Sequence, residues 1–302
     1  MVAKIIDYLR KNFQYLRSKN QIRKLSDHVI SNDKNEIRLF TIAKNEMLRF
    51  PFFLEYYRKL GVNTFFILDN NSDDGLTEYL LKQKDVHLFH TKESYTYQLN
   101  WRLFLLNSFG KGHWCVTVDA DELMVFDHSE KRGLLSLIEE LQEANANCLK
   151  ALWIDMYSDK AIRETNYNQG ESFFEACYYF DRESATKSVN ERVFGWRTEF
   201  DKTPLVKYQK GLYIDKGFHR VSGEARYAEA RCVVFHFNYF SDFIDKCKRE
   251  SDRAVYFDGG AKYKRFMRVV EQEPLISLHN SKSVKYESSD QLLELSYIIP
   301  IK

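Results

Sequence analysis

The chain has 302 residues, of which 44% are apolar and 29% are charged, and its formal net charge at pH 7 is +2. This composition is typical of a globular protein with a buried core, and it excludes disordered and fibrous proteins. Because positive and negative charges nearly balance, no overall field favours nucleic acid as a partner. With four prolines and no long Gly/Ser tract, the sequence contains no obvious interdomain linker.

The five cysteines are widely spaced and form no C-x-x-C pair, which argues against a zinc site. Their odd number fits a reducing cytosol, where a buried structural cysteine is far more common than a nucleophilic one. No apolar run is long enough to span a bilayer, and the first residues do not read as a signal peptide. We therefore expect a cytoplasmic protein.

Residues 1–34 are expected to form a basic amphipathic helix followed by a linker. Apolar side chains recur there at helical spacing, and residues 1–24 contain seven Lys or Arg against one Asp. Such a helix can lie on the anionic inner face of a membrane, or it can pack on the protein with a solvated polar face. The sequence leaves both interpretations open.

Strands and helices alternate from residue 36 to residue 119. Buried strands are expected at 36–43, 64–70, 86–90 and 113–119, and helices at 45–61, 75–84 and 96–110. This alternation predicts βαβ units and hence an α/β fold, Rossmann-like, with a mostly parallel sheet flanked by helices. Ligands bind such sheets beyond the carboxyl ends of the strands, which here are residues 41–46, 69–74, 90–92 and 119–122.

The pattern changes after residue 130. Helices are expected at 133–144, 241–257 and 261–270, and strands at 148–157 and 232–240. Residues 160–232 are irregular and aromatic, which indicates short strands and loops. We interpret residues 35–258 as one α/β domain whose irregular half shapes the site of a second substrate, and residues 259–302 as a helical tail.

The segment HWCVTVDADELMVF (residues 113–126) is a strand that ends in three carboxylates, Asp119, Asp121 and Glu122. An Asp-x-Asp pair is a weak signal alone, but a strand end in a βα alternation presents carboxylates to a cleft. Hard oxygen ligands suit Mg²⁺ or Mn²⁺, and Mg²⁺ is often held by one or two carboxylates plus substrate phosphates. The alternative is a solvated turn with helix-capping Asp residues.

The segments TIAKNE (41–46), LDNNSDDG (68–75) and VDADEL (118–123) together resemble bacterial glycosyltransferase family 2 proteins. The resembling branch carries K-N-E after the first strand, D-N-x-S-x-D after the second and D-x-D-E after the fourth. The resemblance covers roughly residues 36–258 and includes the later segments IDMY, YFDR, KTPLVKY, FHR and VVFHFNYFSDF. It implies the GT-A fold and a metal-dependent transfer of sugar from a nucleoside-diphosphate sugar.

The resemblance also implies roles for individual residues. The nucleoside would be lined by Thr41, Ala43, Asn45 and Glu46, with Asp69 accepting a hydrogen bond from the base or ribose. Asp119 and Asp121 would hold Mn²⁺ or Mg²⁺ against the diphosphate. A late histidine often completes metal or phosphate binding in such enzymes. His236 is the best match and His219 the second, although a histidine in an apolar strand is commonly a satisfied core group.

The sequence departs from the family's better-known members in one respect. They carry an E-D or T-E-D motif after the D-x-D, which supplies the general base, and no such motif occurs here. An inverting transfer needs a carboxylate near the acceptor hydroxyl. Asp155 is the first candidate, Asp181 the second and Asp215 the third, and each also has a structural or acceptor-binding interpretation.

Two other classes of protein compete with this reading. A sugar-phosphate nucleotidyltransferase would carry a Gly-rich loop after the first strand, and TIAKNEMLRF (41–50) contains no glycine. A non-catalytic nucleotide-sugar-binding module remains open. The resemblance implies a function in cell-surface polysaccharide synthesis, in which the acceptor is a glycan or a lipid-linked chain. The protein would reach a lipid-linked acceptor as a peripheral protein on the cytosolic face of the membrane.

Overall fold

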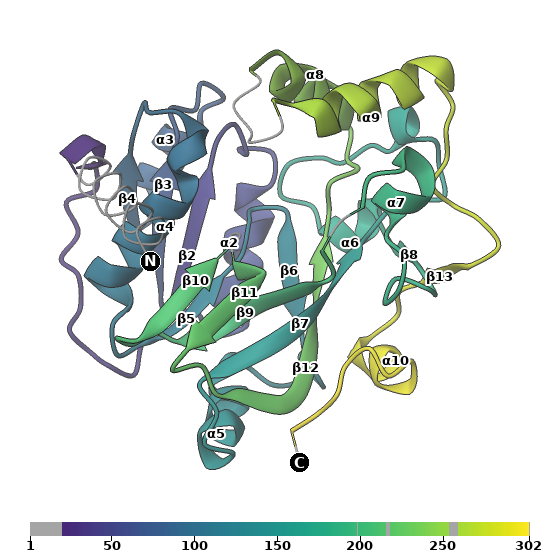
Figure 1. The fold of residues 1–302 in the computed structure, drawn as a ribbon. Coiled ribbons are helices and arrows are strands. Elements are labelled where there is room, and N and C mark those ends of the chain that lie inside the picture. Colours follow the sequence, from purple (N-terminus) through teal and green to yellow (C-terminus); the bar gives the residue numbers. More distant parts are fainter. Residues whose placement is uncertain (1–19, 198, 216–217, 254–258, 302) are drawn as a thin grey trace, which may run out of the picture.

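A computed structural model describes residues 20–197, 199–215, 218–253 and 259–301. Within these residues, one mixed sheet of nine strands runs in the order β1-β4-β3-β2-β5-β9-β7-β12-β6, with helices packed against it (Figure 1). The expected α/β fold is thus confirmed, but the sheet is mixed around a parallel core and not mostly parallel. The amphipathic helix expected at residues 2–17 lies outside the described residues.

The first half of the sheet is the predicted βα alternation. Its elements are β2 (Ile37–Ala43), α2 (Phe50–Lys59), β3 (Thr64–Asp69), α3 (Leu76–Leu81), β4 (Val86–His90), α4 (Gln98–Leu105) and β5 (Trp114–Thr117). β2 pairs in parallel with both β3 and β5, and β3 pairs in parallel with β4. Because both faces of these strands are covered, they read as continuous apolar runs.

Short elements complete this half. They are β1 (Arg23–Lys24), which pairs antiparallel with β4, the 3₁₀ turn η1 (Tyr95–Tyr97) before α4, and the π-helical turn η2 (Leu106–Gly110) after it.

The second half of the sheet mixes directions. β7 (Cys148–Asp155) pairs in parallel with β12 (Tyr227–His236), and β6 (Glu122–Val125) lies antiparallel at the edge beside β12. β9 (Asp201–Lys207) lies antiparallel between β5 and β7 and joins the two halves. Residues 160–232, expected to hold only short strands and loops, therefore supply an interior strand of the main sheet.

The rest of that region is made of short elements, as expected. They are η3 (Ile162–Glu164), α6 (Phe173–Ala176), β8 (Tyr179–Asp181), α7 (Val189–Phe194), β10 (Leu212–Asp215) and β11 (Arg220–Gly223).

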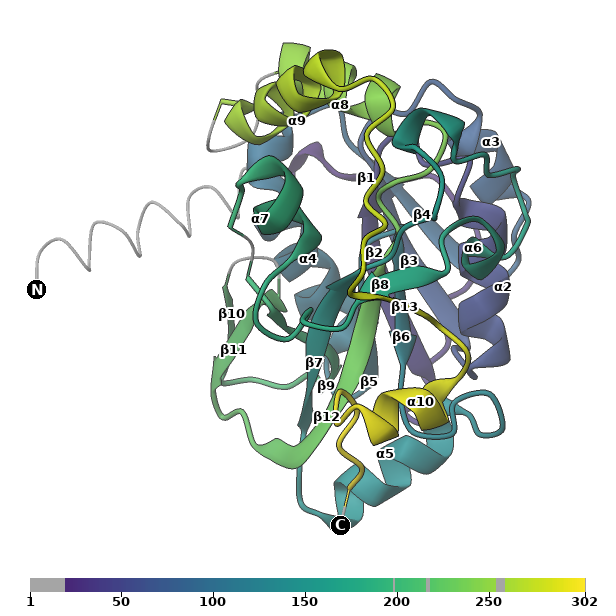
Figure 2. The same cartoon turned by 90° about the vertical axis from the view of Figure 1, so that its right-hand side faces the viewer.

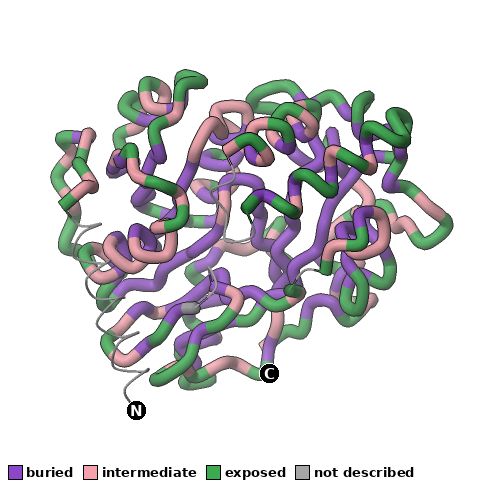
Figure 3. Tube along the Cα trace, turned by 45° about the horizontal axis from the view of Figure 1, so that its top comes forward, coloured by how far each residue is buried: buried purple, intermediate pink, exposed green. Residues whose placement is uncertain are grey.

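Helices cover the two faces of the sheet unequally. α2, α3 and α5 (Leu134–Glu143) share one apolar cluster with the strands, and α4 packs on the other face beside the β10–β11 hairpin. α2 packs against the sheet through one apolar side, whose buried residues are Phe50, Phe53, Leu54 and Tyr57. Burial is accordingly concentrated in the strands and the inner sides of the helices, while loops are exposed (Figure 3).

A third apolar cluster lies beyond one end of the sheet, where α7 packs against α8 (Phe243–Arg253) and α9 (Ala261–Gln272) (Figure 2). The segment expected to be a helical tail contains α9 and α10 (Ser289–Glu294), and also the strand β13 (Ser283–Lys285), which pairs with β8. Among the described residues, none of the helices combines the length and apolar character needed to cross a membrane.

Candidate functional site

The strand order reverses at the carboxyl ends of β2 and β5. From β2 the chain proceeds outward to β3 and β4, and it then returns to place β5 on the other side of β2. Open α/β sheets bind ligands in the crevice at such a reversal. The residues that follow β2 and β5 therefore face the most favourable position for a ligand, and these are the K-N-E and D-x-D-E segments.

The loop after β2 is fixed by the loop after β3. The backbone N–H of Asn45 donates to Ser72 Oγ (2.8 Å), and Asn45 Oδ1 accepts from the N–H of Asp73 (2.9 Å). The N–H of Met47 donates to Asp74 Oδ2 (2.8 Å). Asn45 has a φ of 55°, a left-handed conformation that Asn tolerates better than most residues. These hydrogen bonds join the K-N-E and D-N-x-S-x-D segments into a single connected loop structure.

The residues expected to line the nucleoside divide into two groups. Thr41, Ala43 and Asp69 are buried within the sheet, whereas Asn45 and Glu46 lie in the partly exposed loop. Asp69 accepts hydrogen bonds from Ser72 and from Thr77 Oγ1 (2.9 Å). Its carboxylate therefore stabilises the loop that follows β3.

Thr41 differs from the other buried members of this group, because its Oγ1 has no hydrogen-bond partner among the described residues. Glu46 accepts from Arg49 Nη1 (3.0 Å) and lies 3.2 Å from Lys246 Nζ.

Asp119 is the most accessible carboxylate of the acidic strand end, with 42% of its side chain exposed. Its Oδ1 accepts from Arg102 of α4, and its Oδ2 lies 3.6 Å from Lys202 Nζ of β9. Burial alone would raise the pKa of Asp119, but Arg102 and Lys202 outweigh it and hold the pKa well below its ordinary value. Asp119 is therefore an anion that faces solvent on one side and two cations on the other.

Asp121 is nearly buried and contacts two basic groups. Its Oδ2 accepts from Lys246 Nζ of α8 (3.1 Å) and lies 3.6 Å from His236 Nε2 at the end of β12. Although burial would raise the pKa of Asp121, Lys246 and His236 lower it well below its ordinary value. The structure thus brings Asp121 and His236 together, as a shared metal site would require.

Glu122 does not belong to the cleft, contrary to its grouping with the other two carboxylates. It begins β6, and its buried side chain accepts from Lys202 Nζ, from Trp153 Nε1 (2.9 Å) and from the backbone N–H of Asp119 (2.7 Å). With its lone pairs used inside the protein, Glu122 supports the turn that carries Asp119.

Asp155, the first candidate base, lies behind His236. Its Oδ1 is 2.8 Å from His236 Nδ1, and its Oδ2 accepts from Asn190 Nδ2 (3.3 Å). Burial would lower the pKa of His236, but Asp121 and Asp155 raise it to about 9, so the ring is protonated at neutral pH. A carboxylate that holds one ring nitrogen commonly orients the other toward a metal, and metal binding there would displace the proton.

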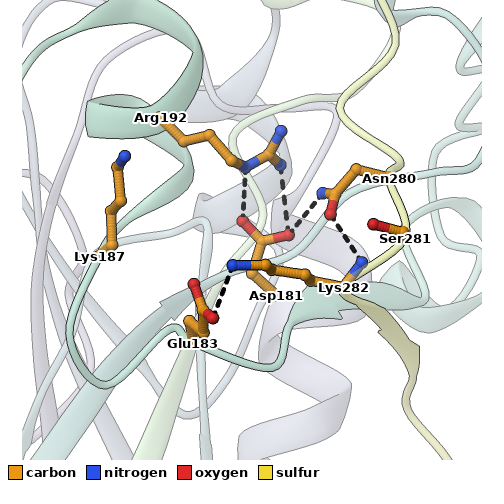
Figure 4. A pocket seen from close by; sticks show the side chains of 7 residues that line it. All are labelled: Asp181, Glu183, Lys187, Arg192, Asn280, Ser281 and Lys282. Carbon is orange, nitrogen blue, oxygen red and sulfur yellow. Dashed lines mark hydrogen bonds and ion pairs between the residues drawn. The ribbon is translucent and has the colours of Figure 1, made fainter.

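Asp181, the second candidate base, lines a separate pocket of about 200 Å³ between α7 and the turn before β13 (Figure 4). Its carboxylate accepts from Arg192 Nε (2.8 Å), Asn280 Nδ2 (3.0 Å) and Tyr157 Oη (2.5 Å). These bonds join β8, α7 and the C-terminal segment, so Asp181 has a structural role that explains its burial.

The two remaining candidates lie in and beside the β10–β11 hairpin. Asp215 ends β10, and its backbone pairs with Arg220. His219 lies in the turn of this hairpin, where its Nδ1 is 2.8 Å from the carbonyl of Asp201. No contact in the described residues joins His219 to Asp121 or His236.

A metal ion would need ligands from the substrate. Within the described ranges, no group of three or more His, Cys, Asp or Glu side chains is arranged to hold a metal by itself. Asp119, Asp121 and His236 supply two carboxylates and an imidazole, and Mg²⁺ is typically held by one or two carboxylates together with substrate phosphates. Asp121 and His236 already lie together, whereas the oxygens of Asp119 lie on Arg102 and Lys202 and would have to turn toward a metal that enters with a phosphorylated ligand.

The basic residues of the site went unnoticed in the sequence. Arg102 had a usable signal, because an arginine between Trp101 and Leu103 in an apolar helix calls for a partner. Lys202 and Lys246 had none, because each reads as an ordinary surface charge. Their partners are 80 and 125 residues away in the chain.

No protein-family model matches the chain, and a comparison with curated proteins finds no match either.

Proposed function

We propose that the protein is a metal-dependent glycosyltransferase with the GT-A fold, which moves a sugar from a nucleoside-diphosphate sugar to a glycan or lipid-linked acceptor. The observation that carries the proposal is that Asp119 and Asp121 directly follow β5, at the crevice where the strand order reverses. The K-N-E and D-N-x-S-x-D segments follow the neighbouring strands and are joined by hydrogen bonds. Three motifs of the resembling family thus share one edge of the sheet.

The donor would lie across this edge with its nucleoside toward the loops after β2 and β3. Mn²⁺ or Mg²⁺ held by Asp119, Asp121 and His236 would neutralise the charge of the departing diphosphate. Asp119 is the carboxylate that solvent reaches, so it is the first to meet an incoming ligand. Asp155 would orient His236 rather than act as a base, because both of its oxygens are already hydrogen-bonded inside the protein.

The acceptor would approach from the side of the irregular half, where α7 and the β10–β11 hairpin border the sheet. An inverting transfer requires a base at the acceptor hydroxyl. Asp155 and Asp181 are buried and bonded to their neighbours, which favours positioning roles for both. Asp215 stays a candidate. If the acceptor is lipid-linked, the amphipathic helix expected at residues 2–17 would bring the protein to the cytosolic face of the membrane.

The test is a panel of nucleotide sugars incubated with Mn²⁺ or Mg²⁺, in which release of nucleoside diphosphate is followed for the wild type and for Asp119→Asn. Asp27→Asn, at an exposed residue outside the acidic strand end, is the matched control. Metal-dependent release that Asp119→Asn abolishes supports the proposal. Binding without release would favour a nucleotide-sugar-binding module, and diphosphate formation from a nucleoside triphosphate and a sugar phosphate would favour a nucleotidyltransferase.

A further inference from the structure

Lys246 reaches the acidic strand end from outside the sheet. It lies on α8, and its ammonium group bridges Asp121 Oδ2 (3.1 Å) and Glu46 Oε1 (3.2 Å). Only 13% of its side chain is exposed. A cation is thus held between the K-N-E and D-x-D-E motifs.

Two other cations near the acidic strand end serve the fold. Lys202, 2% exposed, donates to both oxygens of the buried Glu122, and Arg102, 5% exposed, pairs with Asp119. Lys246 differs because it is more exposed and because it contacts both the K-N-E and the D-x-D-E motif, through Glu46 and Asp121. An ammonium group has three donors, and the two carboxylates use two of them.

The position of Lys246 is set by a second, buried ion pair. Arg49 is fully buried at the start of α2, where it donates to Glu46 (3.0 Å) and to both oxygens of Asp242 (2.7 and 2.8 Å). Asp242 immediately precedes α8. Arg49 therefore holds the start of α8 and the carboxylate of Glu46 together, and so fixes where Lys246 points.

We propose that Lys246 binds the diphosphate of the nucleotide donor. The inference rests on the proposed function and adds a residue to its site. If Asp121 gives its oxygens to a metal ion, it can no longer neutralise Lys246, and the ammonium group needs another anion. The diphosphate is the anion that enters with the metal, and Lys246 already contacts two of the motifs at this strand end. Lysine is a common point charge for phosphate groups in proteins.

The test compares the affinities of nucleoside diphosphate and of the matching nucleoside in the presence of Mn²⁺, measured by calorimetry. The nucleotide is the tightest-binding one of a panel of UDP, GDP, ADP, CDP and dTDP. The variants are Lys246→Met and Lys246→Arg, and the control is Lys248→Met, on the same helix and exposed. Thermal unfolding of each variant shows whether it folds.

We expect Lys246→Met to weaken binding of the diphosphate by about 10- to 100-fold, the usual cost of a lost hydrogen bond to a charged group. Binding of the nucleoside should stay within about twofold, and Lys246→Arg should recover part of the loss. An unchanged diphosphate affinity in Lys246→Met would overturn the inference, as would an equal loss of both affinities, because the lysine would then act on the fold of the site. If the wild type binds no nucleoside diphosphate, the proposed function itself fails.

Discussion

Breaking the buried pair between Lys202 and Glu122 should destabilise the whole protein. Lys202→Met leaves the Glu122 carboxylate, 3% exposed, without its cation, while Trp153 and the N–H of Asp119 still hold it in place. Removing one partner of a buried pair typically costs about 3–5 kcal/mol, because the remaining charge is not neutralised. We expect this loss in the free energy of unfolding, which is a large share of the total for an ordinary domain.

Urea unfolding followed by circular dichroism measures the loss, with Lys207→Met at the end of the same strand as the control. The double variant Lys202→Met/Glu122→Gln removes the uncompensated charge and should recover most of the stability, leaving the cost of weakened hydrogen bonds, on the order of 1 kcal/mol each. A loss below about 1 kcal/mol in Lys202→Met would refute the reasoning and return Glu122 to the group of ligand-facing carboxylates.

Four further outcomes are expected. Asp121→Asn should abolish turnover while the protein stays folded, and full activity in that variant or in excess chelator would rule out the metal role. Burial lowers the pKa of His236, but its carboxylate neighbours raise it to about 9, above the unfolded value. Its stabilisation is therefore complete below about pH 6.5 and lost as pH rises through 9, so the urea midpoint should fall more steeply over that range in the wild type than in His236→Asn. Asp69→Ala should cost about 1–3 kcal/mol of stability, since it leaves the donors of Ser72 without their acceptor, and an unchanged unfolding curve would contradict this. Deleting residues 1–19 should abolish co-sedimentation with anionic liposomes if this segment binds membranes, and a full-length protein that ignores such liposomes would end that idea.

The parallel half of the sheet could be predicted because its signals are local. β2 and β3 are apolar runs flanked by polar loops, and the predicted strand at residues 86–90 coincides with β4. Helix ends were predicted less well: α2 begins at Phe50, after the irregular K-N-E loop, rather than at residue 45. That loop is held by side chains from the loop after β3, which is a tertiary effect.

β9 could not be predicted as an interior strand, because Pro204 lies in its middle and a proline argues against a central strand. In the structure the pairing of β9 with β7 is interrupted between Leu149 and Ala151, opposite this part of the strand. The irregularity accommodates a residue that has no N–H to donate. Nothing in the sequence near Pro204 indicates that the partner strand is irregular at this point.

The candidate site was predicted in part. Asp119 and Asp121 were placed correctly at a strand end, and the alternation explains why. The sequence could not show that each carboxylate has a counter-ion from the protein. These counter-ions, Arg102, Lys202 and Lys246, come from three elements that only the fold brings together. Glu122 was misplaced because a following strand as short as β6, with four residues, is hard to distinguish from a turn.

The most direct measurement is a crystal structure of the protein grown with Mn²⁺ and the nucleoside diphosphate that binds most tightly. The proposal predicts the metal at Asp119 and Asp121, the diphosphate beside it, and the nucleoside along the loops that follow β2 and β3. A nucleotide bound elsewhere, such as in the pocket of Asp181, or a metal that avoids both carboxylates, would contradict it.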